Sequence, residues 1–323
     1  MAEHRSPYRP PRPVTRPVRV DPTGRTGPTP GAARGPRWRR VAHGWYVPST
    51  VDGSVPEQRV AEAVPSVLAG GGLTGWAALL LHGAAFLDGT APDGRTRLPV
   101  QVRLPVDHHR DPLPGTTVVR GDLRRTTLLR GLPCASVQQA VLDGMRLQRD
   151  RREAVVLLDM TLAARITDLR QVRRLVESRS WRGVPGVPTA RWALDHASQA
   201  SASPPETRYR LVWTLDAGLA RPVVNQPVFD LRGRLLGYPD LLDPVTGLVG
   251  EYDGEDHRRS LRHSHDVSRE ATFRRHGLEV TRATSWDLRD REVLADRIRE
   301  AHDRARSAPP GRRLWTLTAP PDW

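Results

Sequence analysis

Hydrophobic positions in the last third of the chain alternate between helical and strand-like spacing. The pattern predicts, in chain order, a helix at 206–219, strands at 223–229, 235–242 and 248–253, a helix at 260–276, a strand at 278–284 and a helix at 287–306. Helix, three-stranded meander, helix, strand and helix is the order of an α/β sandwich. Small polar residues and a proline pair at 200–205 predict a linker in front of it.

The pattern in residues 37–200 is mixed, with strands first and mostly helices afterwards. Aromatic and β-branched residues around Gly44 predict a β-hairpin at 37–48, and strands are expected at 100–104 and 117–120. Helices are expected from Pro56 to about Leu68, around 74–81, and at 136–147, 152–165, 168–178 and 189–201. The fold class is therefore α/β, with a mixed α+β region before the sandwich.

The two ends of the chain lack such patterns. Residues 1–36 contain nine prolines, which forbid a regular helix or an inner strand. We expect a disordered arm rich in Pro and Arg, which either contacts nucleic-acid phosphates or is a solvated segment. We treat residues 307–323 as a tail.

Charge and composition narrow the classes of partner and of site. The net charge is +14, every basic residue is arginine, and residues 1–40 carry ten arginines against two acids. Such a balance favours a polyanionic partner, although residues 204–306 carry eighteen charges of each sign. The single cysteine, Cys134, excludes a disulfide framework and a cysteine-based zinc cluster. No apolar run is long enough for a membrane span, and we expect a cytoplasmic protein.

Three carboxylates fall on two predicted strands joined by the turn sequence at 243–247. If the turn is symmetric about its middle, Asp240 lies opposite Glu251, and Asp253 lies on the same face as Glu251. At ~5 Å and an effective dielectric of ~20, such a pair repels by roughly 3 kcal/mol. A Mg²⁺ or Mn²⁺ ion relieves this repulsion, and nucleases use such an ion to activate water. The alternative is an acidic outer face with the register shifted by one residue.

Further polar residues could join this cluster, and each has a simpler explanation. Glu206 is a metal ligand or a helix N-terminal acid, and His257 is a general acid or base or a solvated loop residue. Arg282 contacts a phosphate or forms a salt bridge to the acids. Arg269 touches the site or pairs with Asp266 on its own helix.

Five motifs in this region together resemble a known nuclease family. They are Ser203-Pro204-Pro205-Glu206-Thr207-Arg208, Tyr238-Pro239-Asp240, Glu251-Tyr252-Asp253-Gly254-Glu255-Asp256-His257, Asp266-x-x-Arg269 and His276-Gly277-Leu278-Glu279-Val280-Thr281-Arg282. In this order they resemble the very-short-patch-repair (Vsr)-like endonuclease domain, in particular an uncharacterised actinobacterial branch of it. That domain belongs to the restriction-endonuclease-like PD-(D/E)XK superfamily, and the likeness covers residues 203–306.

The resemblance implies a metal-dependent DNA endonuclease with a defined set of site residues. Asp240 and Glu251 match the metal-binding acids, Glu206 the acid of the first helix, and His257 the histidine after the strand. The general PD-(D/E)XK pattern has a lysine two residues after the second acid, where this chain has Asp253. Asp253 can only add a metal ligand, so proton transfer falls to His257. The alternative function is a non-catalytic, antitoxin-like DNA-binding regulator that keeps a degenerate nuclease fold.

Residues 37–200 resemble, more loosely, the front half of AbiEi-type antitoxins. The stretch 38–48 resembles the wing of their winged helix, which places Arg39 and Arg40 as nucleic-acid contacts, and 73–83 resembles the helix that follows. The helix-turn-helix that precedes the wing in that family would fall in the proline-rich arm. The resemblance therefore implies a winged-helix remnant and leaves a toxin as a further partner.

Overall fold

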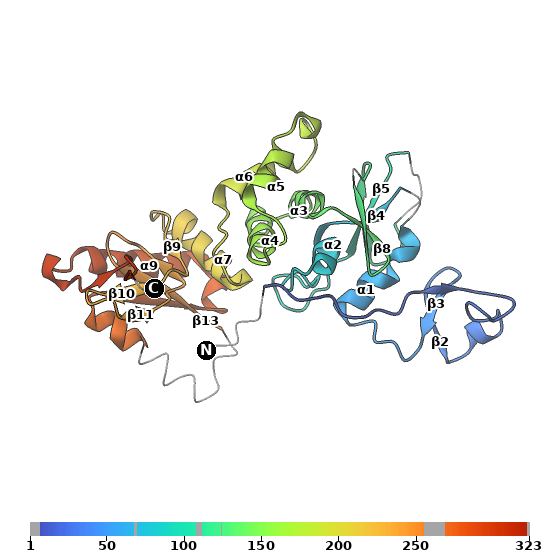
Figure 1. Ribbon diagram of the computed structural model, residues 1–323, viewed down its shortest axis with the longest axis horizontal. Helices are drawn as coiled ribbons and strands as arrows, with labels where there is room; N and C mark the ends of the chain where they lie inside the picture. The colour runs from blue at the N-terminus through green and yellow to red at the C-terminus, as the bar shows by residue number, and fades with distance from the viewer. Residues whose placement is uncertain (1–6, 68–69, 108–111, 124, 255–268, 322–323) are drawn as a thin grey trace. The chain divides into compact units, whose positions relative to one another are not determined.

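The computed structural model of the chain consists of two compact units, Met1–Ala197 and Ser198–Trp323 (Figure 1). The described residues are 7–67, 70–107, 112–123, 125–254 and 269–321. Both units combine helices with β-sheets, which confirms the general α/β class. No helix among these residues has the length and apolar character that a bilayer crossing requires.

Unit 1 is built on a five-stranded sheet with helices beside it. The strands, in the order β6-β5-β4-β8-β7, are β6 Thr116–Arg120, β5 Val100–Leu104, β4 Gly72–Leu73, β8 Leu132–Ala135 and β7 Thr126–Leu129. The helices are α1 Pro56–Glu62, α2 Gly75–His82, α3 Val137–Arg146, α4 Arg151–Ala163, α5 Leu169–Val176 and α6 Val187–His196. The six predicted helices are present. The first ends at Glu62 instead of Leu68, because Pro65 lacks the N–H that another helical turn requires.

A small sheet of order β1-β3-β2 lies at the start of unit 1. Its strands are β1 Val18–Arg19, β2 Trp38–Ala42 and β3 Trp45–Pro48. The pairing of β2 with β3 confirms the predicted hairpin. The pairing of β1 with β3 adds a strand from the segment predicted to be an arm.

The predicted disorder of residues 1–36 is wrong for its described part, residues 7–36. The backbone N–H of Arg12 donates to Glu57 at 3.2 Å, and that of Thr15 donates to the Gln58 side chain at 2.9 Å. The Arg9 guanidinium pairs with Glu57 at 3.0 Å. Prolines exclude a helix, but an extended chain can still give its remaining N–H groups to side chains of α1.

Unit 2 contains two sheets where the sequence predicts one meander. The first, of order β14-β13-β12-β9, comprises β14 Glu279–Thr284, β13 Leu248–Asp253, β12 Leu241–Leu242 and β9 Val223–Val224. The second, of order β11-β10-β15, comprises β11 Leu235–Gly237, β10 Val228–Asp230 and β15 Trp315–Thr316. The meander prediction fails because Pro227 and Pro239 interrupt the two longer predicted strands. Strands β13 and β14 are parallel, and the other pairs in both sheets are antiparallel.

Apolar layers cover both faces of the four-stranded sheet. On one face, α7 (Pro204–Leu211), the π-helical turn Val212–Asp216 and α9 (Arg291–Arg306) contribute a core that includes Tyr209 and Ile298. On the other face, Phe273 of the helix at 269–275 packs with residues of the three-stranded sheet β11-β10-β15. The sheet is therefore buried on both sides, and polar groups on its strands lie close to an apolar interior.

Residues 307–321 complete the fold of unit 2, so their prediction as a tail is wrong. The side chain of Trp315 in β15 is 2% exposed and belongs to the second apolar layer. Its ring packs so closely on Gly247 that a Cβ there would lie 3.2 Å from it. The Arg313 guanidinium covers the same ring at 4.0 Å. One buried tryptophan thus anchors the segment. The sequence does not predict this, because Trp315 is flanked mainly by polar residues and belongs to no long apolar pattern.

Candidate active site

The carboxylate cluster begins with the register of β12 on β13. Leu241 is opposite Gly250 and Leu242 is opposite Val249, which is the predicted pairing. Asp240, one residue before β12, therefore lies at the position opposite Glu251. The alternative of a register shifted by one residue is excluded.

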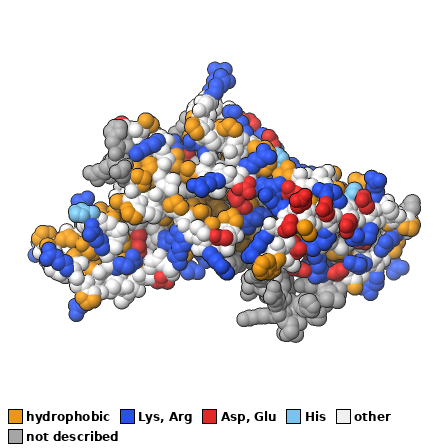
Figure 2. All heavy atoms as spheres, turned by 180° about the vertical axis from the view of Figure 1, so that it is seen from behind, with side chains coloured by type: hydrophobic (Ala, Val, Ile, Leu, Met, Phe, Trp, Pro, Cys, Tyr) orange, Lys and Arg blue, Asp and Glu red, His pale blue; other side chains and the backbone are white. Residues whose placement is uncertain are grey.

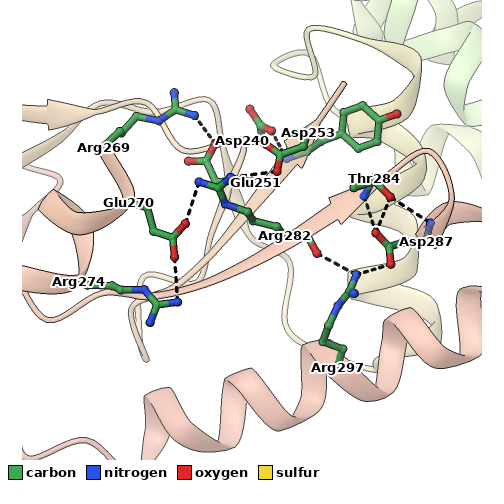
Figure 3. Close-up of polar contacts among 11 residues, drawn as sticks. Asp240, Glu251, Asp253, Arg269, Glu270, Arg274, Arg282, Thr284, Asp287 and Arg297 are labelled. Atoms are coloured by element: carbon green, nitrogen blue, oxygen red, sulfur yellow. Dashed lines mark hydrogen bonds and ion pairs between the residues drawn. The ribbon is translucent and has the colours of Figure 1, made fainter. Parts of the chain in front are cut away.

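The predicted carboxylates also share one face of the sheet. Val249 and Val280 belong to the apolar layer on the side of Phe273. Because side chains alternate along a strand, Glu251, Asp253 and Arg282 point to that same side. The parallel register pairs Glu251 with Arg282 and Asp253 with Thr284 (Figure 3).

Asp240 lies in an environment that disfavours its charge. The backbone N–H of Tyr252 donates to its Oδ2 at 2.7 Å. Desolvation raises the pKa of Asp240 well above its usual value, and the negative charges of Glu251 and Glu206 raise it further. The Tyr252 hydrogen bond and Arg269 oppose this increase without cancelling it. A proton or a cation at this carboxyl therefore stabilises the folded site.

Arginines neutralise the other two carboxylates of the cluster. Arg269, from the helix at 269–275, binds the buried Glu251 at 2.7 Å, so it touches the site as one of the two predictions states. Arg282 binds Asp253 at 3.1 Å and Glu270 at 2.8 Å, which is the salt bridge predicted as its simpler role. Figure 3 shows both arginines reaching into the cluster from different elements.

Glu206 caps the helix on which it lies. Ser203 Oγ donates to its Oε1 at 2.8 Å, while the N–H of Ala202 and the side-chain amide of Asn225 each donate to its Oε2 at 2.9 Å. Glu206 thus lies in the first turn of α7 and binds groups around the N-cap Ser203, which is the simpler of the two predicted roles, a helix N-terminal acid. Its charge still acts on Asp240, because it contributes to the raised pKa of that carboxyl.

Asn225 joins these two acids and was not predicted. Its φ of 50° is left-handed, a conformation that asparagine tolerates better than most residues. Its backbone N–H donates to the carbonyl of Asp240 at 3.2 Å, and its side chain reaches Glu206. The sequence signal, an asparagine shortly before Pro227, predicts a turn but not these contacts.

Tyr209 was also not predicted, and it underlies the cluster from the opposite face of the sheet. It is fully buried, and a Cβ at Gly250 would lie 2.9 Å from its ring and its hydroxyl. Desolvation raises the pKa of Tyr209 far above its usual value, and the charges of Asp240 and Glu251 add to the increase. The tyrosine is thus a neutral support, and Gly250 is the residue that leaves room for it.

The remaining predicted residues lie either outside the described part of the chain or in unit 1. His257 and Asp266 lie outside the described residues. In unit 1, Arg39 forms a bidentate pair with Glu62, and the exposed Arg40 lies 3.2 Å from His43. Within the described part of the chain, no group of three or more His, Cys, Asp or Glu residues is arranged to hold a metal ion. The candidate ligands are therefore a pair, Asp240 and Glu251.

The charge around this pair is mixed. Figure 2 shows acidic side chains of unit 2 interleaved with arginines over one face of the molecule. This agrees with the equal numbers of acidic and basic residues in 204–306. Residues 204–306 therefore carry no net positive charge that would attract a polyanion over a long distance.

Comparisons with known proteins place the chain in no family. No family model, no curated protein and no solved structure matches it. The resemblance to Vsr-like endonucleases rests on the five sequence motifs alone.

Proposed function

We propose that the chain is a metal-dependent DNA endonuclease whose unit 2 is a Vsr-like domain with a restriction-endonuclease-like α/β sandwich. The observation that supports this most is the desolvated Asp240, one residue before β12, at the position opposite Glu251 of β13. Two carboxylates in such a position destabilise each other unless a proton or a cation intervenes. Carboxylate oxygens are the protein ligands that Mg²⁺ and Mn²⁺ prefer.

In this proposal each residue of the cluster has a separate role. Asp240 and Glu251 hold the ion, and the hydrogen bond from Tyr252 fixes the orientation of the Asp240 carboxylate. A bound Mg²⁺ supplies charge neutralisation at the phosphate and a lower pKa of the attacking water. Arg269 and Arg282 are placed to bind phosphate oxygens, since their guanidinium groups match phosphate as well as carboxylate. They provide the positive charge that lysine supplies in the general superfamily pattern.

Glu206 and Asp253 have supporting roles in this proposal. Glu206 keeps its capping contacts and adds negative charge near Asp240. Asp253 holds the Arg282 guanidinium in position until a substrate phosphate takes the place of the Asp253 carboxylate as its partner. Proton transfer by His257 stays a prediction from the motif resemblance.

Plasmid nicking in Mg²⁺ or Mn²⁺ tests the proposal. Asp240→Ala and Glu251→Ala should each lower the nicking rate by about 100-fold or more, the effect expected when one electrostatic element of a site is removed. Asp296→Ala is the matched control, because Asp296 is an exposed acid on α9. Wild-type protein that nicks no faster than the two site variants contradicts the proposal.

A second candidate function is the non-catalytic, antitoxin-like DNA-binding regulator. The observation that favours it is the neutralisation of Glu251 and Asp253 by arginines, which needs no metal ion. DNA affinity would then come from unit 1, where exposed arginines include Arg25, Arg34 and Arg37. A toxin partner belongs to this candidate.

The salt dependence of DNA binding tests the second candidate, with substitutions that leave the strands of unit 1 in place. Replacing Arg25, Arg34 and Arg37 by Gln should reduce the slope of log affinity for DNA against log salt by up to about three, since each phosphate contact releases about one counterion. A slope equal to that of the wild type contradicts a role of these arginines. Nicking activity in the wild type separates the first candidate from the second.

A further inference from the structure

Trp286 is a large aromatic residue on the surface, two residues after the end of β14, the strand that carries Arg282. Its side chain is 65% exposed. The guanidinium of Arg289 lies 4.2 Å from the centre of its ring. The arginine occupies one face of the indole, and much of the remaining ring surface is open to solvent.

The turn that holds Trp286 is fixed by hydrogen bonds and an ion pair. The N–H and the hydroxyl of Thr284 both donate to Asp287 at 2.7 Å. Arg297 of α9 pairs with Asp287 at 2.9 Å and donates to the carbonyl of Arg282 at 2.9 Å (Figure 3). The exposed ring is therefore presented from an ordered turn, and little conformational entropy is lost when a ligand stacks on it.

The position of this turn relates the ring to the carboxylate cluster. Thr284 is the parallel partner of Asp253, and neighbouring strands lie ~4.8 Å apart. Trp286 follows two residues later, so its Cα lies within about 7 Å of that of Thr284. The turn that carries Trp286 is thus close enough to the cluster for a strand with a phosphate there to reach this turn with the base of a neighbouring nucleotide.

We propose that Trp286, supported by Arg289, is a stacking site for an unpaired nucleobase, so that this edge of unit 2 binds single-stranded DNA. A base can stack on the face of the indole opposite Arg289, while the arginine attracts a phosphate of the same strand. Any base can stack, so the site selects strand state and not sequence. The inference rests on the proposed function for the choice of DNA as the polymer.

Binding measured by fluorescence anisotropy in EDTA tests this site apart from any cleavage. The probes are a labelled thymidine 16-mer and an abasic strand of the same length, which keeps the phosphates and lacks the bases. Trp286→Ala in the full chain should weaken thymidine-strand binding by about tenfold or more and leave abasic-strand binding unchanged. Trp286→Phe should retain most of the affinity, and the equally exposed Leu231→Ala should bind as the wild type does.

Two results overturn the inference. One is Trp286→Ala binding the thymidine strand as tightly as the wild type. The other is a wild type that binds both strands equally, or binds neither. The Asp240→Ala variant, which tests the proposed endonuclease, should keep its preference for the thymidine strand. Loss of stacking and loss of cleavage are therefore distinguishable.

Discussion

Each unit contains an aspartate whose pKa is raised by desolvation, and the two differ in their neighbours. In unit 1, the fully buried Asp143 of α3 accepts hydrogen bonds from Arg103 at 2.8 and 2.9 Å and from Thr74 at 2.7 Å. In unit 2, the charged groups that act on Asp240 are Glu251 and Glu206, which raise its pKa, and more weakly Arg269, which lowers it. Among the described residues, no basic side chain forms an ion pair with Asp240.

The comparison teaches that burial of an acid does not by itself indicate a functional site. Desolvation is the largest cause of the raised pKa at both Asp143 and Asp240. At Asp143 the surrounding charges lower the pKa again, since Arg103 and Arg146 are positive. At Asp240 the nearby acids raise it further. At the first cluster the buried charge of Asp143 is paired with arginine, whereas at the second the neighbouring acids raise the free-energy cost of a charge on Asp240, which a bound cation can offset.

The largest expected effect on stability comes from a substitution that breaks the Asp143 cluster of unit 1. Arg103→Ala leaves Asp143 buried without its main partner and should lower the free energy of unfolding by about 3–5 kcal/mol. Urea denaturation measures this loss, with the more exposed Arg299→Ala as the control. A loss below about 1 kcal/mol, similar to that of a surface pair, contradicts the structural role assigned to Asp143.

An intermediate effect of opposite sign is expected at Asp240. The pKa of Asp240 is higher in the folded chain than in the unfolded chain. The stability that its protonated form contributes is therefore fully present below the pKa of the unfolded chain, and it is lost as the pH rises through the pKa of the folded chain. Asp240→Asn removes this loss and should raise the free energy of unfolding near pH 7.5 by about 1–3 kcal/mol. Asparagine also retains an oxygen that can accept from Tyr252.

Urea denaturation of wild type and Asp240→Asn at pH 4 and pH 7.5 measures the change. The stabilisation should shrink toward zero at pH 4. Asp143→Asn is the matched comparison and should destabilise the chain at pH 7.5, because Arg103 then lacks a charged partner. An Asp240→Asn variant that is less stable than the wild type at pH 7.5 contradicts the account.

The smallest effect concerns competition for Glu251. Arg269 is 39% exposed at its side chain, so its pair with Glu251 contributes at most about 1 kcal/mol. Arg269→Ala should therefore tighten Mn²⁺ binding by about two- to fivefold, because the cation no longer displaces a guanidinium. Calorimetry measures the affinity, and Arg299→Ala should leave it unchanged. Weaker binding in Arg269→Ala means that the arginine assists the ion.

The sequence predicts the centre of this site because its contacts are local. A symmetric turn and the two-residue period of a strand suffice to place Asp240 opposite Glu251 and Asp253 beside it. The helices of unit 1 follow from apolar spacing and capping residues for the same reason.

Contacts between distant parts of the chain escape such reasoning. The sequence does not show that Asn225 reaches Glu206, or that residues 7–36 bind side chains of α1. It also does not show that Trp315 completes the core of unit 2. Each depends on a fold that must form first. For Arg269 the sequence leaves two partners open, and the described residues show the contact with Glu251.

Isothermal titration of Mn²⁺ into the full chain tests the central claim most directly. We predict binding in the wild type and in Asp296→Ala, and its loss in Asp240→Ala and in Glu251→Ala. Equal heats in all four proteins, or no heat in the wild type, contradict the claim that these two carboxylates form a divalent-cation site.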